Sequence, residues 1–156
     1  MQNNKVYNIK ETTEKIQSYC ALQDRCQWEV ERKMREWGTD EYVIENILTD
    51  LILEKFIDEQ RYAESFSRGK FRIKKWGRVK IKKELKTKNI SMVCINKGLL
   101  QIDDKEYLNT LQQLYIKKRD SIKDKNQFIR KGKIAKYLQQ KGFESNLIWE
   151  LINKDK

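Results

Sequence analysis

Residues 76–90 read WGRVKIKKELKTKNI, and this stretch decides the fold. Ile81 and Leu85 stand four residues apart, so they share one face of a helix, while the lysines around them occupy the other faces. Asn89 is a residue type that tolerates the left-handed backbone conformation in which helices commonly end. The stretch therefore predicts a short amphipathic helix that ends near residue 88.

The same signature occurs twice more along the chain. It consists of an apolar pair, a basic or aromatic residue and a helix-stopping residue, and it recurs at Val30, Met34 and Trp37-Gly38 and at Ile134, Leu138 and Lys141-Gly142. The separations from Val30 to Ile81 and from Ile81 to Ile134 are 51 and 53 residues. A nearly constant period of this length is typical of proteins built from repeated supersecondary units.

Each unit has a predicted helix on both sides of this central one. The preceding helices cover residues 12–23, 58–75 and 104–122, where apolar side chains recur at helical spacing. A short amphipathic helix follows each stop, and Gly98 is expected to weaken the middle one, since an interior glycine costs about 1 kcal/mol relative to alanine. We predict an all-α fold in which three tandem three-helix repeats form an elongated, curved molecule.

The period also sets the predicted boundaries. Residues 1–11 form a flexible N-terminal tail, 12–57 the first repeat, 58–102 the strongly basic second repeat and 103–156 the third. Only 38% of the 156 residues are apolar and 37% are charged, which suits several small cores better than one large core.

Positive charge is concentrated in the second repeat. The chain carries a net charge of +11. Residues 1–60 hold 8 basic and 13 acidic side chains, residues 61–100 hold 13 and 2, and residues 101–156 hold 13 and 8. Such a basic block attracts phosphate backbones or acidic protein surfaces.

Composition and motifs disfavour several function classes. There is no apolar run of 18 residues, and the polar start of the chain lacks signal-peptide character, so we expect a cytoplasmic protein without a membrane contact. Histidine is absent and the three cysteines lack CxxC spacing, so we expect no metal and no cofactor. Glycine-rich phosphate loops and nucleophile elbows are also missing, and we expect no catalytic residues and no enzymatic activity.

Two stretches, one where the first and second repeats meet and one downstream of it, resemble the RecX family. They are FIDEQRYA, residues 56–63, and the basic segment of residues 76–90. The resemblance is carried by Phe56, Ile57, Asp58, Glu59, Arg61, Tyr62, Ala63, Gly77, Ile81 and Leu85. It extends over roughly residues 12–153 and is weakest in the third repeat.

The resemblance implies a regulator of homologous recombination, DNA repair and the SOS response. A chain similar to RecX is expected to bind RecA filaments on single-stranded DNA, to lie along their helical groove, and to modulate, usually inhibit, recombinase and co-protease activity. The implied partners are therefore the RecA filament and the single-stranded DNA within it, and we expect the protein itself to be a monomer.

The FIDEQRYA segment has a structural explanation. Asp58 suits the cap of the helix that begins there, and Glu59 favours the positive end of that helix. Phe56, Tyr62 and Ala63 would pack where the two repeats meet. We interpret the segment as a joint between repeats with no catalytic role.

The basic stretch is instead predicted to contact a ligand. Glu64 and Glu84 are the only acidic residues among 13 basic ones in residues 61–100, so local ion pairs cannot neutralise the field. The candidate contacts to nucleic acid or filament are Arg68, Lys70, Arg72, Lys74, Lys75, Trp76, Arg78, Lys80, Lys82, Lys83 and Lys86. Trp76 could stack on a base or pack in a core. A second basic region around residue 125 is diluted by Asp120 and Asp124 and fits a contact surface and a solvated surface equally well.

Two other functions stay open at this point. In one, the protein is a stand-alone helical nucleic-acid-binding protein whose short helices act as helix-turn-helix units. In the other, it is a scaffold for an acidic protein partner. Salt-dependent binding to naked DNA would favour the first, and binding without any dependence on DNA would favour the second.

Overall fold

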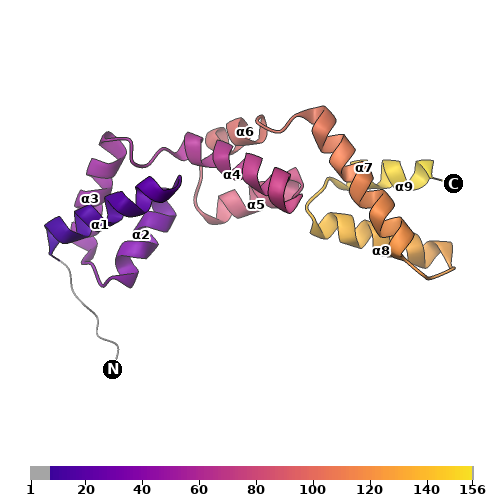
Figure 1. The fold of residues 1–156 in the computed structure, drawn as a ribbon, viewed down its shortest axis with the longest axis horizontal. Helices are drawn as coiled ribbons and strands as arrows, with labels where there is room; N and C mark the ends of the chain where they lie inside the picture. The colour runs from indigo at the N-terminus through magenta and orange to yellow at the C-terminus, as the bar shows by residue number, and fades with distance from the viewer. Residues whose placement is uncertain (1–7, 156) are drawn as a thin grey trace, which may run out of the picture.

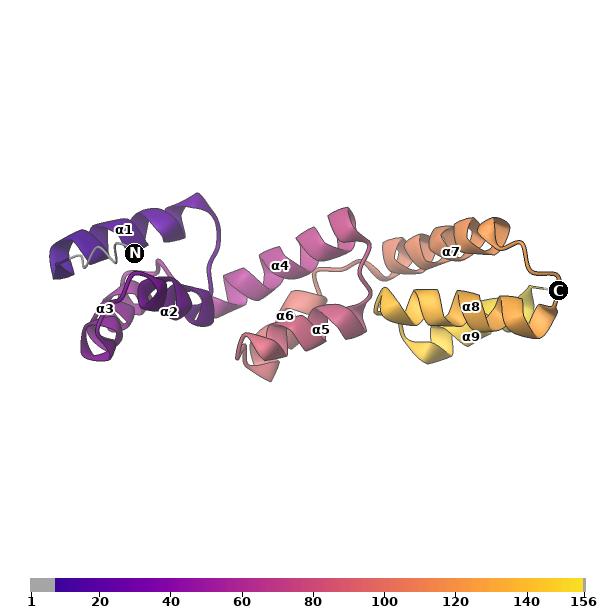
Figure 2. The ribbon, with the colours of Figure 1, turned by 90° about the horizontal axis from the view of Figure 1, so that it is seen from below.

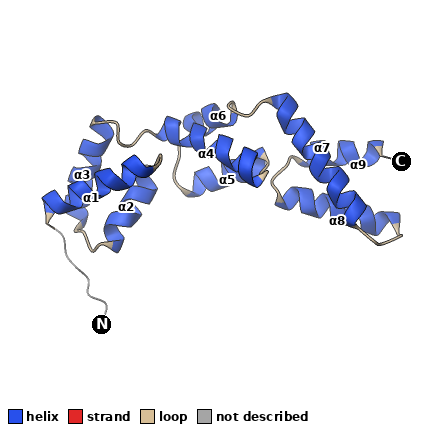
Figure 3. Ribbon diagram, viewed as in Figure 1, coloured by secondary structure: helices blue, strands red, loops and turns tan. Residues whose placement is uncertain are grey.

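The computed structural model describes residues 8–155, and within them the regular structure consists of nine α-helices without a strand. The helices are α1 (Ile9–Leu22), α2 (Gln27–Glu36), α3 (Glu41–Leu53), α4 (Glu59–Lys74), α5 (Arg78–Thr87), α6 (Met92–Leu99), α7 (Asp104–Ser121), α8 (Gln127–Gln140) and α9 (Ser145–Lys154). Figure 3 shows the same all-helical chain coloured by secondary structure. The predicted all-α fold is confirmed.

The helices form three consecutive three-helix units. Figures 1 and 2 show α1–α3, α4–α6 and α7–α9 following one another along the long axis of the molecule, so the chain is elongated. The two ends of the described chain lie at opposite ends of this row. No helix within residues 8–155 is both long enough and apolar enough to cross a bilayer.

The three predicted helix stops adopt the expected backbone conformation. Gly38, Asn89 and Gly142 have φ values of 75°, 59° and 96°. These left-handed residues end α2, α5 and α8 and turn the chain toward the third helix of each unit. Lys55 and Lys75 also have positive φ, at 61° and 58°, and the sequence pattern did not predict them.

The predicted N-terminal tail needs a correction. Residues 1–7 of the tail lie outside the described residues. Ile9 to Glu11 form the first turn of α1, which begins three residues earlier than residue 12. The cause is Asn8, whose side chain accepts a hydrogen bond from the backbone N–H of Glu11 at 2.8 Å and so caps the helix.

The three units do not each have a separate buried core. The first unit has its own core, built around Ile16, Met34, Ile44 and Leu51. A single continuous core runs through the second and third units to the isoleucines of α9, and it also takes in Cys26 at the start of α2. Among residues 8–155 the buried side chains thus form two cores, and the larger one joins two repeats.

Gly98 has a packing role that the sequence pattern did not reveal. A Cβ atom at this position would lie 2.6 Å from the backbone oxygen of Ala63. Glycine therefore lets α6 lie directly against the backbone of α4, and the close approach offsets the unfavourable helix propensity.

Candidate functional site

A row of aromatic side chains lies along the second unit, between α4 and α5. The ring centroids of Tyr62 and Phe66 are 5.7 Å apart, and those of Phe66 and Trp76 are 6.4 Å apart. Tyr62 is buried, whereas Phe66 and Trp76 are half-buried. The row forms because Tyr62 and Phe66 are four residues apart on α4, and the left-handed Lys75 turns the chain so that Trp76 returns beside them.

Lysines cover this aromatic row. The Nζ atom of Lys70 is 4.9 Å from the centroid of Trp76 and 5.4 Å from that of Phe66. Lys80 adds its Nζ at 4.4 Å from Trp76. These distances are within the range of cation–π attraction. Trp76 thus packs against the core on one side, as one interpretation predicted, and meets cations on the other, while stacking on a base stays a prediction.

Most of the lysine charges near this row are not neutralised by ion pairs. The ion pairs among residues 8–155 include none with Lys70, Lys74 or Lys80. Lys88 is the exception, because its Nζ lies 5.1 Å from the centroid of Phe66 and is paired with Glu29. The row therefore faces solvent with an excess of positive charge, which is what attracts an anionic partner.

Lys141, from the end of α8 in the third unit, belongs to the same cluster. Its Nζ donates a hydrogen bond to the backbone oxygen of Lys74 at 2.9 Å. Partial burial lowers the pKa of Lys141, and the neighbouring Lys80 and Lys74 lower it further. The sequence pattern predicted only that Lys141 stands at the end of a helix. No local signal in the sequence places it beside lysines of the second unit.

Arg78 has a different role from the one predicted. Its guanidinium pairs with Asp104 at 2.6 Å and with Glu144 at 3.3 Å, and it lies 3.9 Å from the ring centroid of Tyr107. Its backbone N–H also donates to the Tyr107 hydroxyl at 3.1 Å. These contacts hold the second unit to the third, so the charge of Arg78 is not free for a ligand.

The other predicted contact residues lie along α4 and α5 and in the turn between these helices. Arg68 lies on α4 with its guanidinium 3.0 Å from the side-chain oxygen of Gln101. Lys82, Lys83 and Lys86 lie on α5. Exposed side chains are those of Arg72, Lys74, Lys75, Lys83 and Lys86, while Lys82 is half-buried.

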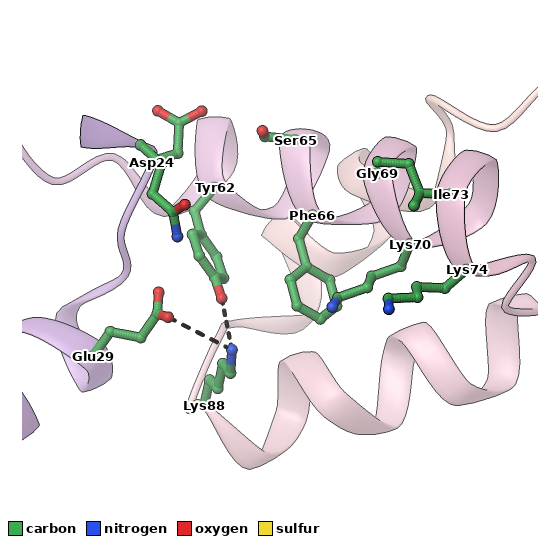
Figure 4. Close-up of a pocket in the computed structure, with 11 residues that line it drawn as sticks. Asp24, Glu29, Tyr62, Ser65, Phe66, Gly69, Lys70, Ile73, Lys74 and Lys88 are labelled. Atoms are coloured by element: carbon green, nitrogen blue, oxygen red, sulfur yellow. Dashed lines mark hydrogen bonds and ion pairs between the residues drawn. The ribbon is translucent and has the colours of Figure 1, made fainter. Parts of the chain in front are cut away.

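A groove of about 360 Å³ adjoins the aromatic row where the first and second units meet. Tyr62, Phe66 and Gly69 line it along α4, and Figure 4 shows Lys70 and Lys74 projecting from the same helix toward α5. At the far end, Lys88 donates to the Tyr62 hydroxyl at 2.9 Å and lies 3.7 Å from a carboxylate oxygen of Glu29. Aromatic surface and cations therefore line the same groove.

The FIDEQRYA segment forms the joint beside this groove. Asp58 accepts a hydrogen bond from the backbone N–H of Arg61 at 2.9 Å and so caps α4, as its position predicted. Arg61 pairs with Asp24 of the first unit at 2.8 Å. Ile57 is buried in the core of the first unit and Ala63 in that of the second. The segment thus connects two cores.

Three-helix domains of one protein family match most of the second and third units. Residues 58–99 match the RecX second three-helix domain, and residues 104–152 match the RecX third three-helix domain. Together these matches cover more than half of the chain.

Similarity to individual proteins agrees with these matches to the family domains. A regulatory protein RecX of Clostridium acetobutylicum is 30% identical over 130 residues, which is 81% of this chain and 60% of the relative. The regulatory protein RecX of Oceanobacillus iheyensis is 30% identical over 136 residues, which is 87% of this chain and 50% of the relative. The chain spans about half to three fifths of the length of such relatives.

Two solved structures have the same architecture. The crystal structure of RecX from Lactobacillus salivarius superposes with a TM-score of 0.80 at 27% identity, covering 94% of this chain and 95% of that one. Another crystal structure of regulatory protein RecX gives a TM-score of 0.84 at 24% identity, covering 94% of this chain and 72% of the other, and it supports the fold alone.

Proposed function

Because the chain belongs to the RecX family, we propose that it binds RecA filaments on single-stranded DNA and modulates, chiefly by inhibition, their recombinase and co-protease activities. The elongated row of three units would lie along the filament groove and bridge neighbouring RecA subunits. The lysine-covered aromatic row of the second unit would face the DNA or an acidic part of the filament. The protein would act by occupancy, without turnover of its own.

The observation that carries this proposal is the unneutralised charge of the second unit. Lys70 and Lys80 lie over Trp76, and Lys141 joins them from the third unit, close enough to feel the charges of Lys80 and Lys74. Holding cations together in a folded protein costs electrostatic repulsion, and a polyanion relieves it. The name of the relatives, regulatory protein RecX, agrees with a binding role.

Co-sedimentation tests the proposed partner. The protein is expected to pellet with RecA assembled on single-stranded DNA, and to pellet much less with RecA alone or with DNA alone. Inhibition of the DNA-dependent ATPase of RecA would be measured in the same samples. A protein that stays in the supernatant with assembled filaments would contradict the proposal.

Charge reversal tests the surface. The variant Lys74→Glu with Lys82→Glu is expected to weaken filament binding by at least tenfold, while the control Lys10→Glu with Lys105→Glu has the same net charge and should bind like the unmodified protein. Lys10, Lys74 and Lys105 are exposed, and Lys82 is half-buried. Equal inhibition by both variants would remove the second unit's basic surface from the mechanism.

Salt titration separates this function from that of a stand-alone DNA-binding protein. A protein held on naked DNA by about 4–6 phosphate contacts should lose affinity with a log–log slope near −4 to −5. Tight and sequence-selective binding to naked duplex in the absence of RecA would favour the stand-alone function.

A further inference from the structure

We propose that the groove between the first and second units is a nucleotide-binding site, which holds a flat base against α4 and its phosphate on Lys70 and Lys74. Where the nucleotide is part of a single strand, this inference rests on the proposed function and specifies where one base of that strand is held. A free nucleotide offers the same chemistry, and the experiments below separate the two sources.

The size and walls of the groove fit a base. Its volume of about 360 Å³ is at the lower end of the range of small-molecule sites, about 300–1,000 Å³. Tyr62, Phe66 and Ile73 provide aromatic and apolar wall on one face of α4. Ile73 is 78% exposed, so its apolar surface is available to a partner in the groove. Stacking on such a wall is tolerant of base identity.

Gly69 supplies the open space on the same wall. It lies inside α4, where glycine destabilises a helix relative to alanine. Gly98 is explained by its approach to Ala63, but a Cβ atom at Gly69 would have no heavy atom within 4 Å. Packing within the protein therefore gives no reason for glycine here. A larger side chain at this position would fill the groove without disturbing any internal contact.

The two ends of the groove differ in their charge. Lys70 and Lys74 stand at one end, and Lys70 now lies over the rings of Phe66 and Trp76. At the other end, Asp24 and Glu29 are already paired with Arg61 and Lys88. A phosphate is therefore attracted to the end where Lys70 and Lys74 have no ion-pair partner, and a lysine that moves to the phosphate uncovers ring surface for the base. The orientation of a bound nucleotide follows from this polarity.

The first test compares two labelled twelve-nucleotide single strands, one of oligo-thymidine and one made only of abasic units with the same phosphates. Fluorescence anisotropy at constant salt is expected to show about tenfold tighter binding of the strand with bases. Equal affinities would overturn the proposal, and they are also the result expected if the groove holds an acidic peptide.

The second test fills the groove. Gly69→Leu is expected to abolish the preference for bases while leaving the binding of abasic strand unchanged. Its melting temperature should equal or exceed that of the unmodified protein, because leucine favours a helix more than glycine does. The matched control is Gly132→Leu, since Gly132 is also a helix-interior glycine with open space but lies on α8, away from the groove. Retention of the preference by Gly69→Leu would overturn the proposal.

Competition identifies the source of the nucleotide. Thymidine monophosphate that displaces the labelled strand at micromolar concentration would assign the groove to a free nucleotide, and absence of competition at millimolar concentration would assign it to a base within a strand. Because RecA is absent from these experiments, a failure of the groove is distinguishable from a failure to bind RecA filaments, which the co-sedimentation experiment reports.

Discussion

The junction between the first and second units differs in kind from the junction between the second and third. At the second junction the backbones themselves are joined: the N–H of Gly77 donates to the oxygen of Lys141 at 2.7 Å, and the N–H of Val79 donates to that of Gly142 at 2.9 Å. No backbone hydrogen bond among residues 8–155 joins helices of the first unit to those of the second in this way. Side chains provide the first junction, through the pairs Arg61–Asp24 and Lys88–Glu29 and through Cys26, which is buried in the core of the second unit.

This difference indicates which parts of the molecule move together. A core that is continuous through two units, with backbone hydrogen bonds across the joint, makes the second and third units one stiff body. The first unit has a core of its own and, among the residues described, contributes only Cys26 and the partly buried Trp28 to the larger core, and it is held besides through ion pairs that solvent and salt weaken. We expect the first unit to change its angle on binding, and the groove at its edge to change shape with it.

The largest predicted effect comes from adding one carbon atom to the stiff junction. In Gly142→Ala the new Cβ would lie 2.2 Å from the Cβ of Lys80 and 2.8 Å from its backbone nitrogen, at a residue whose φ is 96°. Overpacking and an unfavourable backbone should together lower the free energy of unfolding by roughly 3 kcal/mol. Urea denaturation followed by circular dichroism measures the loss.

Gly69→Ala is the control for that measurement. It adds the same atom to open space inside a helix and should raise stability by about 0.5–1 kcal/mol. If Gly142→Ala lost less than about 1 kcal/mol, the two backbones would not be in firm contact, and the contrast between the junctions would disappear.

A pair of arginine substitutions compares the two junctions directly. Arg78→Ala leaves the half-buried carboxylate of Glu144 without its charged partner at the stiff junction, and the expected loss is about 2 kcal/mol. Arg61→Ala removes a more exposed pair with Asp24 at the first junction, for which about 0.5–1 kcal/mol is expected. Both free energies of unfolding would be measured in urea at two salt concentrations. Equal losses would show that the junctions do not differ in this respect.

The arginines also show how far sequence reasoning extends. Local patterns predicted the helices, the three left-handed stops and the basic second unit, because each depends on residues near one another in the chain. Arg78 stands in the same basic run as Lys74 and Lys80, and nothing in that run tells them apart. Its partners, Asp104 and Glu144, are 26 and 66 residues further along the chain.

Two glycines also show that a local sequence pattern does not reveal the role of a residue. Gly69 and Gly98 both lie inside amphipathic helices, and their sequence surroundings predict the same cost for each. The fold places Gly98 against the backbone of Ala63 and leaves Gly69 beside the groove. Lys141 likewise joins the lysine cluster only because two chain segments meet at Gly77 and Gly142. Long-range contacts of this kind determine the site, and helical periodicity does not encode them.

The smallest predicted effect concerns a carboxyl group at the first junction. Burial raises the pKa of Glu59, and the nearby carboxylates of Glu29 and Asp58 raise it further, although the backbone amide of Gln27 opposes them. One oxygen of Glu59 is buried without a hydrogen-bond partner among the described residues. The ionised form therefore destabilises the joint between the units.

The sign of the pH dependence follows from linkage. Because the pKa is higher in the folded than in the unfolded protein, the native state binds a proton more readily, so stability from this group rises as pH falls through the folded pKa toward the unfolded value. Glu59→Gln should remove that rise and should raise the melting temperature at pH 7 by at most about 3 °C. Asp124 and Asp155, whose pKa values are lowered by ion pairs and hydrogen bonds, act in the opposite direction in both proteins. The difference between the melting temperatures of the two proteins, measured from pH 4 to pH 8, therefore reports the contribution of Glu59 alone. A constant difference across that range would mean that the first junction carries no buried charge, and its weakness would then have to come from packing alone.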